Sequence, residues 1–262
     1  MPRSNYGAQF GRVNHLGDIE IIGHRGFAAR APENTLVSIE AALTAGACAV
    51  ELDVRVASCG TPVVIHDETL DRTTDGDGPV LRRSVEQLRA LDAGTWFDPR
   101  FAGERIPTLA EALDHLADKA YHIYPEVKGV RGPSDVDRMV HIVRDRAMSD
   151  RTTFISIDWS ILERVRARDA TIHIGFIVVT ADLFDEAFSL AASDPAAILN
   201  LNHEIVLDDP SLVQRARDES VDVVTWTVNE PHEATRLRQA GVTGFTTDHV
   251  DRLLAWASQE PG

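Results

Sequence analysis

The feature that most restricts the fold of this chain is a repeated alternation of short apolar runs with helical patterns. Eight runs are rich in Ile, Val, Thr and aromatic residues, as strands are, and they occupy residues 19–24, 48–54, 122–127, 152–157, 172–179, 196–201, 221–228 and 242–247. Patterns typical of helices follow them at 34–46, 107–119, 133–148, 159–169, 181–192, 210–219, 231–240 and 249–258. Near-continuous apolar strands that alternate with helices predict an α/β fold with a parallel sheet covered by helices.

A further apolar run, at residues 61–67, breaks this alternation. It follows the second strand, which we extend to residue 56, after only four residues, 57–60. Because a parallel partner needs a crossover of about a dozen residues or more, we interpret 61–66 as the return arm of a hairpin that lies outside the main sheet. The eight remaining strand and helix units fit the length of a TIM (β/α)8 barrel. A doubly wound parallel sheet is the alternative.

The predicted domain organisation is simple. Weak periodicity and the Gly, Asp and Thr content of residues 68–107 predict a small insertion between the second strand and its helix, on the catalytic rim. We expect one barrel domain over 18–262 and a flexible tail over 1–17. The tail lacks the apolar core of a secretory signal, and the chain has no apolar run near 18 residues. With only two cysteines, we expect a reducing, cytoplasmic location.

The charge balance restricts the partners. The chain has 41 acidic and 26 basic residues, a net charge of -15. This acidity argues against nucleic acid and against stable association with an anionic membrane. A chain of this charge that handles an anionic substrate needs local cations or a metal ion.

Carboxylates at the predicted strand ends suggest how such a site is built. Glu51 and Asp53 are two residues apart on one strand and share a face, and Glu126 lies on the next barrel strand. Their mutual repulsion inside a barrel is costly unless a cation is present. Three carboxylates without a cysteine or paired-histidine motif suit a divalent metal ion, Mg²⁺ or Ca²⁺, with Mn²⁺ also acceptable. The alternative is a set of salt bridges to Arg25, Arg55 or Lys128.

Two histidines also fall at strand ends. His24 ends the first strand and His66 ends the hairpin arm, whose register places it roughly opposite Leu52 or Asp53. The two imidazoles can flank one bound group as acid and base. Arg25 and Lys128 supply positive charge for an oxyanion, most naturally a phosphate.

These residues lie in a segment that resembles the glycerophosphodiester phosphodiesterase family. The segment is IIGHRGFAARAPENTLVSIEAALTAGACAVELDVRVASCGTPVVIHDETLDRTTDGDG. The resemblance rests on HRG, PENT, ELDV and the PVV-x-HD-x-x-LDRTT block, then on PEVK at 125–128, FISID at 154–158, WTVN at 226–229 and GVTGFTTD at 241–248. It covers about residues 19–255.

The resemblance implies a TIM barrel with a small insertion after the second strand, and it implies roles for individual residues. These are an acid–base pair of His24 and His66, metal ligands Glu51, Asp53 and Glu126, and phosphate-binding residues Arg25 and Lys128. Trp226 would line the pocket, with a buried core position as the alternative. Asn34 of PENT is predicted to cap the following helix.

The resemblance also implies the activity, which is metal-dependent hydrolysis of glycerophosphodiesters to sn-glycerol 3-phosphate and an alcohol such as choline or ethanolamine. The nucleophile is either the neighbouring glycerol hydroxyl of the substrate or water. One alternative is a phospholipase-type enzyme, similar to lysophospholipase D or phosphatidylinositol-specific phospholipase C. The other is a non-catalytic ligand-binding barrel. We expect a monomer or a homodimer.

Overall fold

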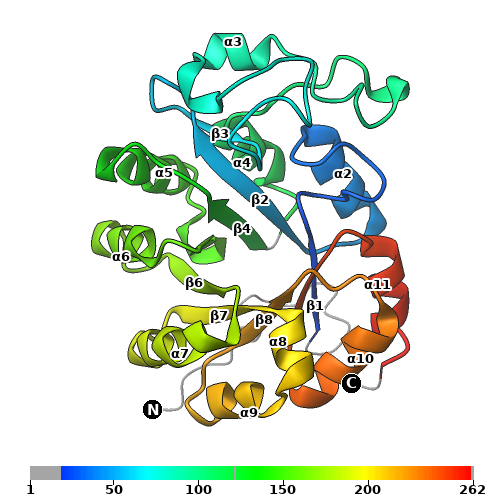
Figure 1. Cartoon of the computed structure of the whole chain (residues 1–262), viewed down its shortest axis with the longest axis vertical. Helices are drawn as coiled ribbons and strands as arrows, with labels where there is room; N and C mark the ends of the chain where they lie inside the picture. The colour runs from blue at the N-terminus through cyan, green and yellow to red at the C-terminus, as the bar shows by residue number, and fades with distance from the viewer. Residues whose placement is uncertain (1–18, 121, 261–262) are drawn as a thin grey trace.

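The computed structural model describes residues 19–120 and 122–260, so the predicted tail at 1–17 lies outside the described residues. Eight parallel strands form the barrel (Figure 1): β1 Glu20–Gly23, β2 Ala49–Val56, β4 His122–Val127, β5 Thr153–Ser156, β6 His173–Val178, β7 Ala197–Asn202, β8 Val223–Trp226 and β9 Gly244–Thr247. The sheet closes because β1 pairs in parallel with both β9 and β2. This closure confirms the predicted TIM barrel and excludes the doubly wound alternative.

Strand β3 (Pro62–Val64) is the predicted hairpin arm. It runs antiparallel to β2, with Val54 opposite Val64, and it does not belong to the closed barrel. The turn contains Gly60 at a φ of 81°, a left-handed conformation that glycine adopts without steric cost. One residue beyond the strand, the Ile65 N–H donates to the Asp53 carbonyl over 2.9 Å, which brings His66 to the level of Leu52.

Helices surround the barrel, as the alternation predicts (Figure 1). They are α2 Leu36–Ala45, α4 Leu109–Leu116, α5 Pro133–Asp145, α6 Trp159–Arg168, α7 Phe184–Ser193, α8 His203–Asp208, α9 Ser211–Asp218, α10 Pro231–Ala240 and α11 Val250–Ala257. Short 3-10 turns lie at η3 Ser149–Arg151 and η4 Ala181–Leu183. The main core is the apolar layer between these helices and the outer face of the barrel. None of the described helices is both long and apolar enough to cross a membrane.

Two local features differ from the sequence-based expectation. Helix α8 has no counterpart in the predicted pattern, since six residues are too few to establish a helical period. Helix α2 ends at Gly46 as predicted, but its N-cap is Thr35, whose hydroxyl accepts from the Ser38 N–H over 3.3 Å. The predicted cap, Asn34, therefore serves another purpose, described below.

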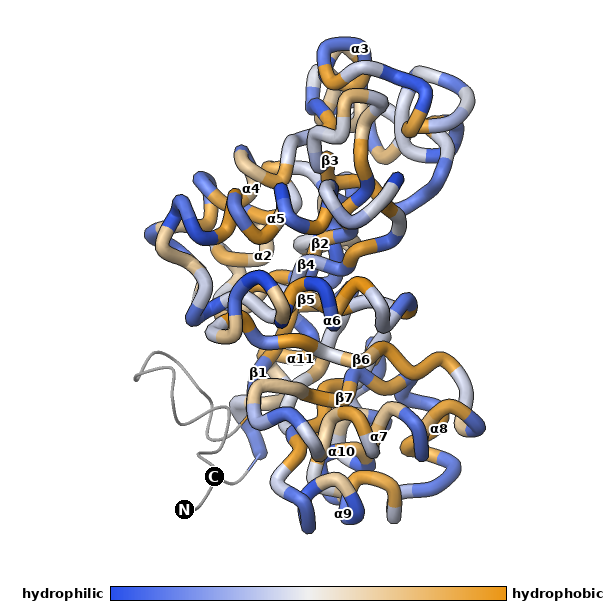
Figure 2. The backbone as a smooth tube through the Cα atoms, turned by 90° about the vertical axis from the view of Figure 1, so that its left-hand side faces the viewer, coloured by the Kyte–Doolittle hydropathy of each residue, from blue (hydrophilic) through white to orange (hydrophobic). Residues whose placement is uncertain are grey.

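Residues 68–107 form a small lobe beside the hairpin, at the top of both views (Figures 1 and 2). It contains η1 Val80–Arg82, α3 Val85–Arg89 and η2 Pro99–Phe101. A separate apolar cluster holds the lobe on the hairpin; its buried members are Ala57, Val63, Ile65, Leu70, Val80, Leu88, Ala93 and Ile106. The lobe thus shares its core with β3 and sits beside the strand that ends near His66.

Candidate active site

The carboxyl ends of the barrel strands enclose a polar site above an apolar floor. Inside the barrel, one apolar side chain from most strands forms a distinct buried cluster: Ile22, Ala49, Tyr124, Ile155, Ile177, Ile198 and Val224. Because side chains alternate along a strand, residues two positions later point into the same interior, one layer closer to the rim. Glu51 follows Ala49 by two residues, and Glu126 follows Tyr124 by two.

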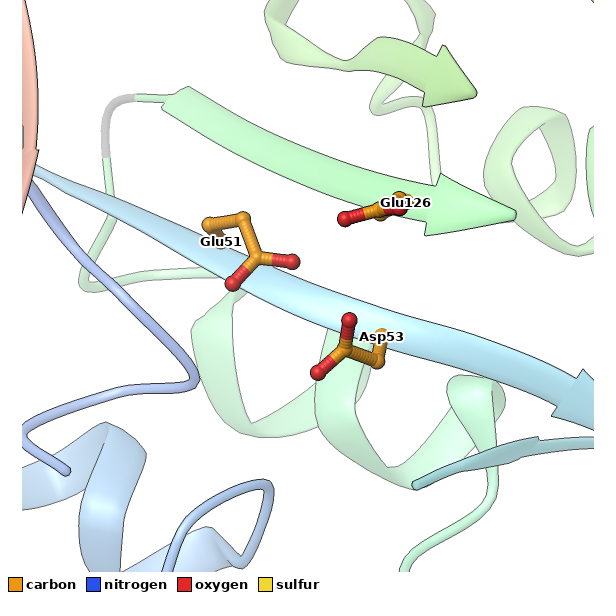
Figure 3. A group of neighbouring side chains, drawn as sticks. All are labelled: Glu51, Asp53 and Glu126. Atoms are coloured by element: carbon orange, nitrogen blue, oxygen red, sulfur yellow. The ribbon is translucent and has the colours of Figure 1, made fainter. Parts of the chain in front are cut away.

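Three carboxylates meet in this layer (Figure 3). Glu51 and Asp53 on β2 and Glu126 on β4 each offer an oxygen within 4.8 Å of the others. Asp53 stands opposite Glu126 in the β2–β4 register. Glu51 and Asp53 are 3% and 0% exposed, so water screens them poorly. Burial raises the pKa of Glu51 well above its usual value, and the charges of Asp53 and Glu126 raise it further.

The donor set of this cluster fits a divalent cation. Oε1 of Glu51 and Oδ1 of Asp53 are buried and accept no hydrogen bond from the residues that the structure describes. Such buried oxygens need a positive partner to offset their lost hydration. Since all the donors are carboxylate oxygens, the ion they suit is a hard one such as Mg²⁺ or Ca²⁺.

Two cations lie against the same carboxylates. Lys128 Nζ is 2.7 Å from Glu126 Oε1 and 3.4 Å from Asp53 Oδ1, and Arg25 Nε is 3.1 Å from Asp53 Oδ2. Burial alone would raise the pKa of Asp53, but the positive charges of Arg25 and Lys128 outweigh it and hold that pKa below its usual value. The carboxylate cluster and the salt bridges considered as its alternative therefore occur together.

The backbone also contributes to the cluster. Arg25 has a φ of 54°, and in this left-handed conformation its N–H donates to Glu51 Oε2 over 2.9 Å. Arg55, the third cation considered from the sequence, lies elsewhere. Its Nε donates to the carbonyl of His66 over 2.7 Å, so it supports the end of the hairpin arm.

His24 is held by residues from the end of the chain. Its Nδ1 lies 2.7 Å from Asp248 Oδ1, and its Nε2 lies 3.9 Å from Glu51 Oε2. Asn229 Nδ2 donates to Asp248 Oδ2, and Asn229 Oδ1 accepts from the Asp248 N–H, both over 2.9 Å. Burial alone would raise the pKa of Asp248, but His24, Asn229 and Arg25 together outweigh it and lower that pKa to about 2. One ring nitrogen is thus fixed on a carboxylate while the other points toward the acidic cluster.

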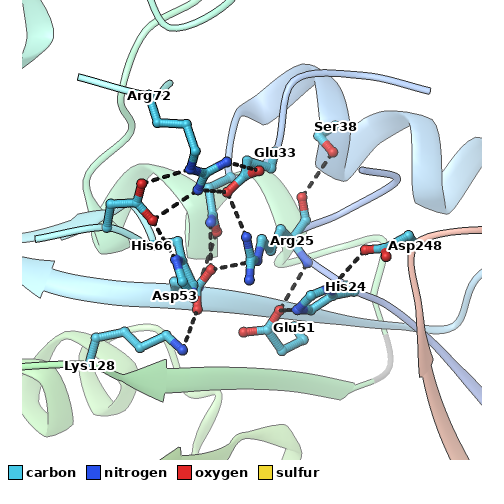
Figure 4. A network of polar contacts seen from close by, with 12 residues as sticks. His24, Arg25, Glu33, Ser38, Glu51, Asp53, His66, Arg72, Lys128 and Asp248 are labelled. Carbon is cyan, nitrogen blue, oxygen red and sulfur yellow. Dashed lines mark hydrogen bonds and ion pairs between the residues drawn. The ribbon is translucent and has the colours of Figure 1, made fainter. Parts of the chain in front are cut away.

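His66 has a similar arrangement with different partners (Figure 4). Its Nδ1 lies 2.7 Å from Asp67 Oδ1. Arg72 donates to Asp67 through Nε and Nη2 over 2.7 and 3.0 Å, which holds the pKa of Asp67 well below its usual range. Burial lowers the pKa of His66, which favours the neutral imidazole. The two histidines therefore differ in environment, although both are anchored through Nδ1.

Asn34 holds Asp53 through two hydrogen bonds and is not a helix cap. Its Nδ2 donates to Asp53 Oδ2 over 2.7 Å, and its Oδ1 accepts from the Asp53 N–H over 3.1 Å. Asn34 adopts a left-handed φ of 60°, and its side chain is buried. The amide fixes one oxygen of Asp53, while the other oxygen stays directed at Lys128 and the carboxylate cluster.

Trp226 ends β8 and packs over the apolar floor of the barrel. It is partly exposed, and its indole Nε1 donates to the Asn200 carbonyl over 3.1 Å. The side chain therefore lies at the interior rim with its N–H already satisfied, which leaves the ring to form an apolar wall.

Several site residues were not assigned a role from the sequence. They are Glu33, Asp67, Arg72, Asn229 and Asp248. All of them lie in the family-like motifs, namely PENT, HD, LDRTT, WTVN and FTTD. Besides these motifs, a polar residue that directly follows a strand, as Asp248 follows β9, is a sequence feature that points to the site.

Known proteins resemble this chain over most of its length. The model of the glycerophosphoryl diester phosphodiesterase family matches residues 24–252. A glycerophosphodiester phosphodiesterase of Caldanaerobacter subterraneus subsp. tengcongensis is 33% identical over 236 residues, which are 89% of this chain and 96% of the relative.

Solved structures share the fold over the same length. A glycerophosphodiester phosphodiesterase from Agrobacterium tumefaciens has a TM-score of 0.79 at 29% identity, with 90% of this chain and 99% of that chain covered. A phosphodiesterase from Oleispira antarctica, solved in complex with the product sn-glycerol-3-phosphate, has a TM-score of 0.83 at 28% identity, with 90% and 96% covered. The chain therefore belongs to the glycerophosphoryl diester phosphodiesterase family, a family of phosphodiester-hydrolysing enzymes.

Proposed function

We propose that this chain hydrolyses glycerophosphodiesters to sn-glycerol 3-phosphate and an alcohol with the help of a divalent cation. One observation carries the proposal: His24 Nε2 lies 3.9 Å from a carboxylate of the three-carboxylate cluster, beside Arg25 and Lys128. The sn-glycerol-3-phosphate bound to the Oleispira antarctica phosphodiesterase supports the choice of product.

Glu51, Asp53 and Glu126 would hold the cation. Two observations support this role. One oxygen of Glu51 and one of Asp53 are buried and accept no hydrogen bond from the described residues, and the three carboxylates repel one another. When bound, a divalent ion neutralises charge on a nonbridging phosphoryl oxygen. Arg25 and Lys128 add two positive charges at the same rim and would bind the other phosphoryl oxygens.

His24 and His66 would act as the acid–base pair. An imidazole that donates from Nδ1 to a carboxylate keeps Nε2 as the nitrogen that exchanges a proton with the substrate. One imidazole removes a proton from the nucleophile, and the other protonates the departing alkoxide. The nucleophile is the neighbouring glycerol hydroxyl or water; a cyclic phosphate detected by phosphorus NMR during turnover distinguishes the first from the second.

Trp226 would form an apolar wall of the substrate pocket. Its position over the floor of the barrel and its satisfied indole N–H support contact with the carbon skeleton of glycerol rather than with the phosphate.

A substrate panel tests the proposal. We expect release of sn-glycerol 3-phosphate from glycerophosphocholine and glycerophosphoethanolamine, lost in EDTA and restored by Mg²⁺, Ca²⁺ or Mn²⁺. Faster turnover of lysophosphatidylcholine would favour a phospholipase-type enzyme instead. No turnover of any phosphodiester with any of these metals would favour a non-catalytic barrel.

Variants of the two histidines test the acid–base assignment. His24→Ala and His66→Ala should each lower kcat by on the order of 10²–10⁴ while the protein stays folded. Near wild-type turnover in either variant would refute the role of that imidazole.

A further inference from the structure

The side chain of Arg72 binds two carboxylates, Asp67 and Glu33, which belong to separate segments of the chain. Its guanidinium makes four hydrogen bonds to carboxylates: Nε and Nη2 to Asp67 over 2.7 and 3.0 Å, and Nη1 and Nη2 each to Glu33 over 2.8 Å. Each carboxylate therefore accepts hydrogen bonds from Arg72 through both of its oxygens. A planar guanidinium can do this, whereas the ammonium of lysine cannot.

Each carboxylate also holds one residue of the proposed machinery. Asp67 Oδ1 lies 2.7 Å from His66 Nδ1, and Glu33 Oε1 accepts from Arg25 Nη1 over 2.8 Å. The contacts thus run from His66 through Asp67, Arg72 and Glu33 to Arg25, as Figure 4 shows for its labelled members. A proposed proton-transfer group and a proposed phosphate-binding group share one anchor.

The backbone around Arg72 is well fixed, although the side chain itself is 43% exposed. Leu70 is 1% exposed and belongs to the apolar cluster of the 68–107 lobe. Thr74 is buried, and its hydroxyl donates to the Leu70 carbonyl over 2.7 Å. Thr73, between Arg72 and Thr74, is buried as well. The lobe therefore holds Arg72 in place above the barrel rim.

Charge makes this anchor necessary. Without Arg72, Glu33 would have Arg25 as its only cationic partner among the contacts described, and Asp67 would have only His66. Glu33 would then draw the guanidinium of Arg25 away from a substrate phosphate, and Asp67 would be free to turn the imidazole of His66.

We propose that Arg72 is a positioning residue that fixes Arg25 and His66 at the same time, through Glu33 and Asp67. This role rests on the proposed function. It gives the 68–107 lobe a part in catalysis, through a residue that acts on Arg25 and His66 by way of their carboxylate partners.

The two branches predict a separable kinetic effect. Glu33→Gln should mainly raise KM, because Arg25 binds the phosphate in both ground and transition states. Asp67→Asn should mainly lower kcat, because His66 acts in the chemical step. Arg72→Ala should do both and lower kcat/KM roughly ten- to hundredfold, the usual range for outer partners of a site. Arg72→Lys should restore little of the loss.

Arg146→Ala is the matched control. Arg146 also grips a carboxylate through two nitrogens, at 2.7 and 2.9 Å from Asp114, but it follows α5 at the opposite end of the barrel. Arg146→Ala should lower the melting temperature about as much as Arg72→Ala does, and it should leave kcat and KM unchanged. Glycerophosphocholine turnover with saturating Mg²⁺ and thermal unfolding are measured for all the variants.

The outcomes separate this proposal from the proposed function. An inactive wild-type protein would refute the proposed function. With an active wild type, the proposal is overturned if Arg72→Ala changes only one of kcat and KM, if it keeps kcat/KM within twofold, or if Arg72→Lys restores full activity. If Arg72→Ala does not fold, the other three variants decide. A raised KM in Glu33→Gln, a lowered kcat in Asp67→Asn and low activity in Arg72→Lys support the proposal, and wild-type kinetics in any of the three overturn it.

Discussion

The anchoring of His24 by Asp248 gives the sharpest test of the site, through the variant Asp248→Asn. In the native protein both carboxylate oxygens accept: Oδ1 from His24 Nδ1 over 2.7 Å and Oδ2 from Asn229 Nδ2 over 2.9 Å. The orientation of Asn229 is fixed, since its Oδ1 accepts from the Asp248 N–H and from the Thr247 hydroxyl. An amide at position 248 has only one acceptor. If the NH₂ group of the new asparagine faces Asn229, two N–H donors oppose each other. If it faces His24, the Nδ1 of His24 must accept instead of donate, which moves the imidazole proton to Nε2.

The pKa of Asp248 limits how much stability the Asn variant can lose. Its value of about 2, against a usual 3.8, corresponds to about 2 kcal/mol of favourable interaction with the charged carboxylate. Because the side chain is 31% exposed, we take this as an upper bound. For catalysis, the expected result in the Asn variant is a kcat lowered by roughly ten- to hundredfold, the usual range for outer partners of a site, with a smaller change in KM.

Stability measurements complete the assay. A depressed folded-state pKa contributes stability that is present above about pH 4 and is lost as the pH falls toward 2. At pH 7 the variant should therefore melt about 2–6 °C lower than the wild type and stay folded at 25 °C. Asp251→Asn is the control, because this exposed ion-pair partner of Arg30 lies three residues along the same segment. A kcat within twofold of wild type for Asp248→Asn would refute the positioning of His24 by Asp248.

Three other predictions concern polar groups that are buried or half-buried. Glu51→Gln should abolish activation by Mg²⁺. It should also raise the melting temperature in EDTA, because it removes a buried carboxylate whose pKa is raised by burial and by Asp53. A lower melting temperature with normal Mg²⁺ activation would contradict this. Asn34→Ala should weaken Mg²⁺ activation ten- to hundredfold by freeing Asp53, and a titration of activity against Mg²⁺ that matches wild type would count against it. Glu20→Gln should stabilise the protein at pH 8 by up to about 3 kcal/mol and have no effect near pH 4. Burial raises the pKa of Glu20 to about 7, so the folded state loses stability as the pH rises through that value. The free energy of unfolding of both proteins is measured with denaturant at pH 4 and pH 8, and an equal difference between variant and wild type at the two pH values would disprove this.

Much of the fold could be predicted because its cues are local. Strand periodicity, helical spacing and the four-residue link before β3 gave the eight barrel units and the hairpin arm, and Gly46 marked the end of α2. Helix α8 was missed because six residues after a strand carry no period. The cap of α2 was misplaced by one residue, since Asn34 and Thr35 are both good capping residues and only the contact with Asp53 separates them.

Local sequence patterns are enough to specify the barrel and the residue types at its rim: carboxylates two apart on β2, a third on the next barrel strand, and histidines at two strand ends. How those groups are held depends on contacts between distant segments of the folded chain. His24 and Asp248 are 224 residues apart and meet because β1 pairs with β9 when the barrel closes. Arg72 reaches Glu33 because the lobe packs on the hairpin. Such pairings arise from closure and packing of distant segments, whereas period and turn preference act over a few residues.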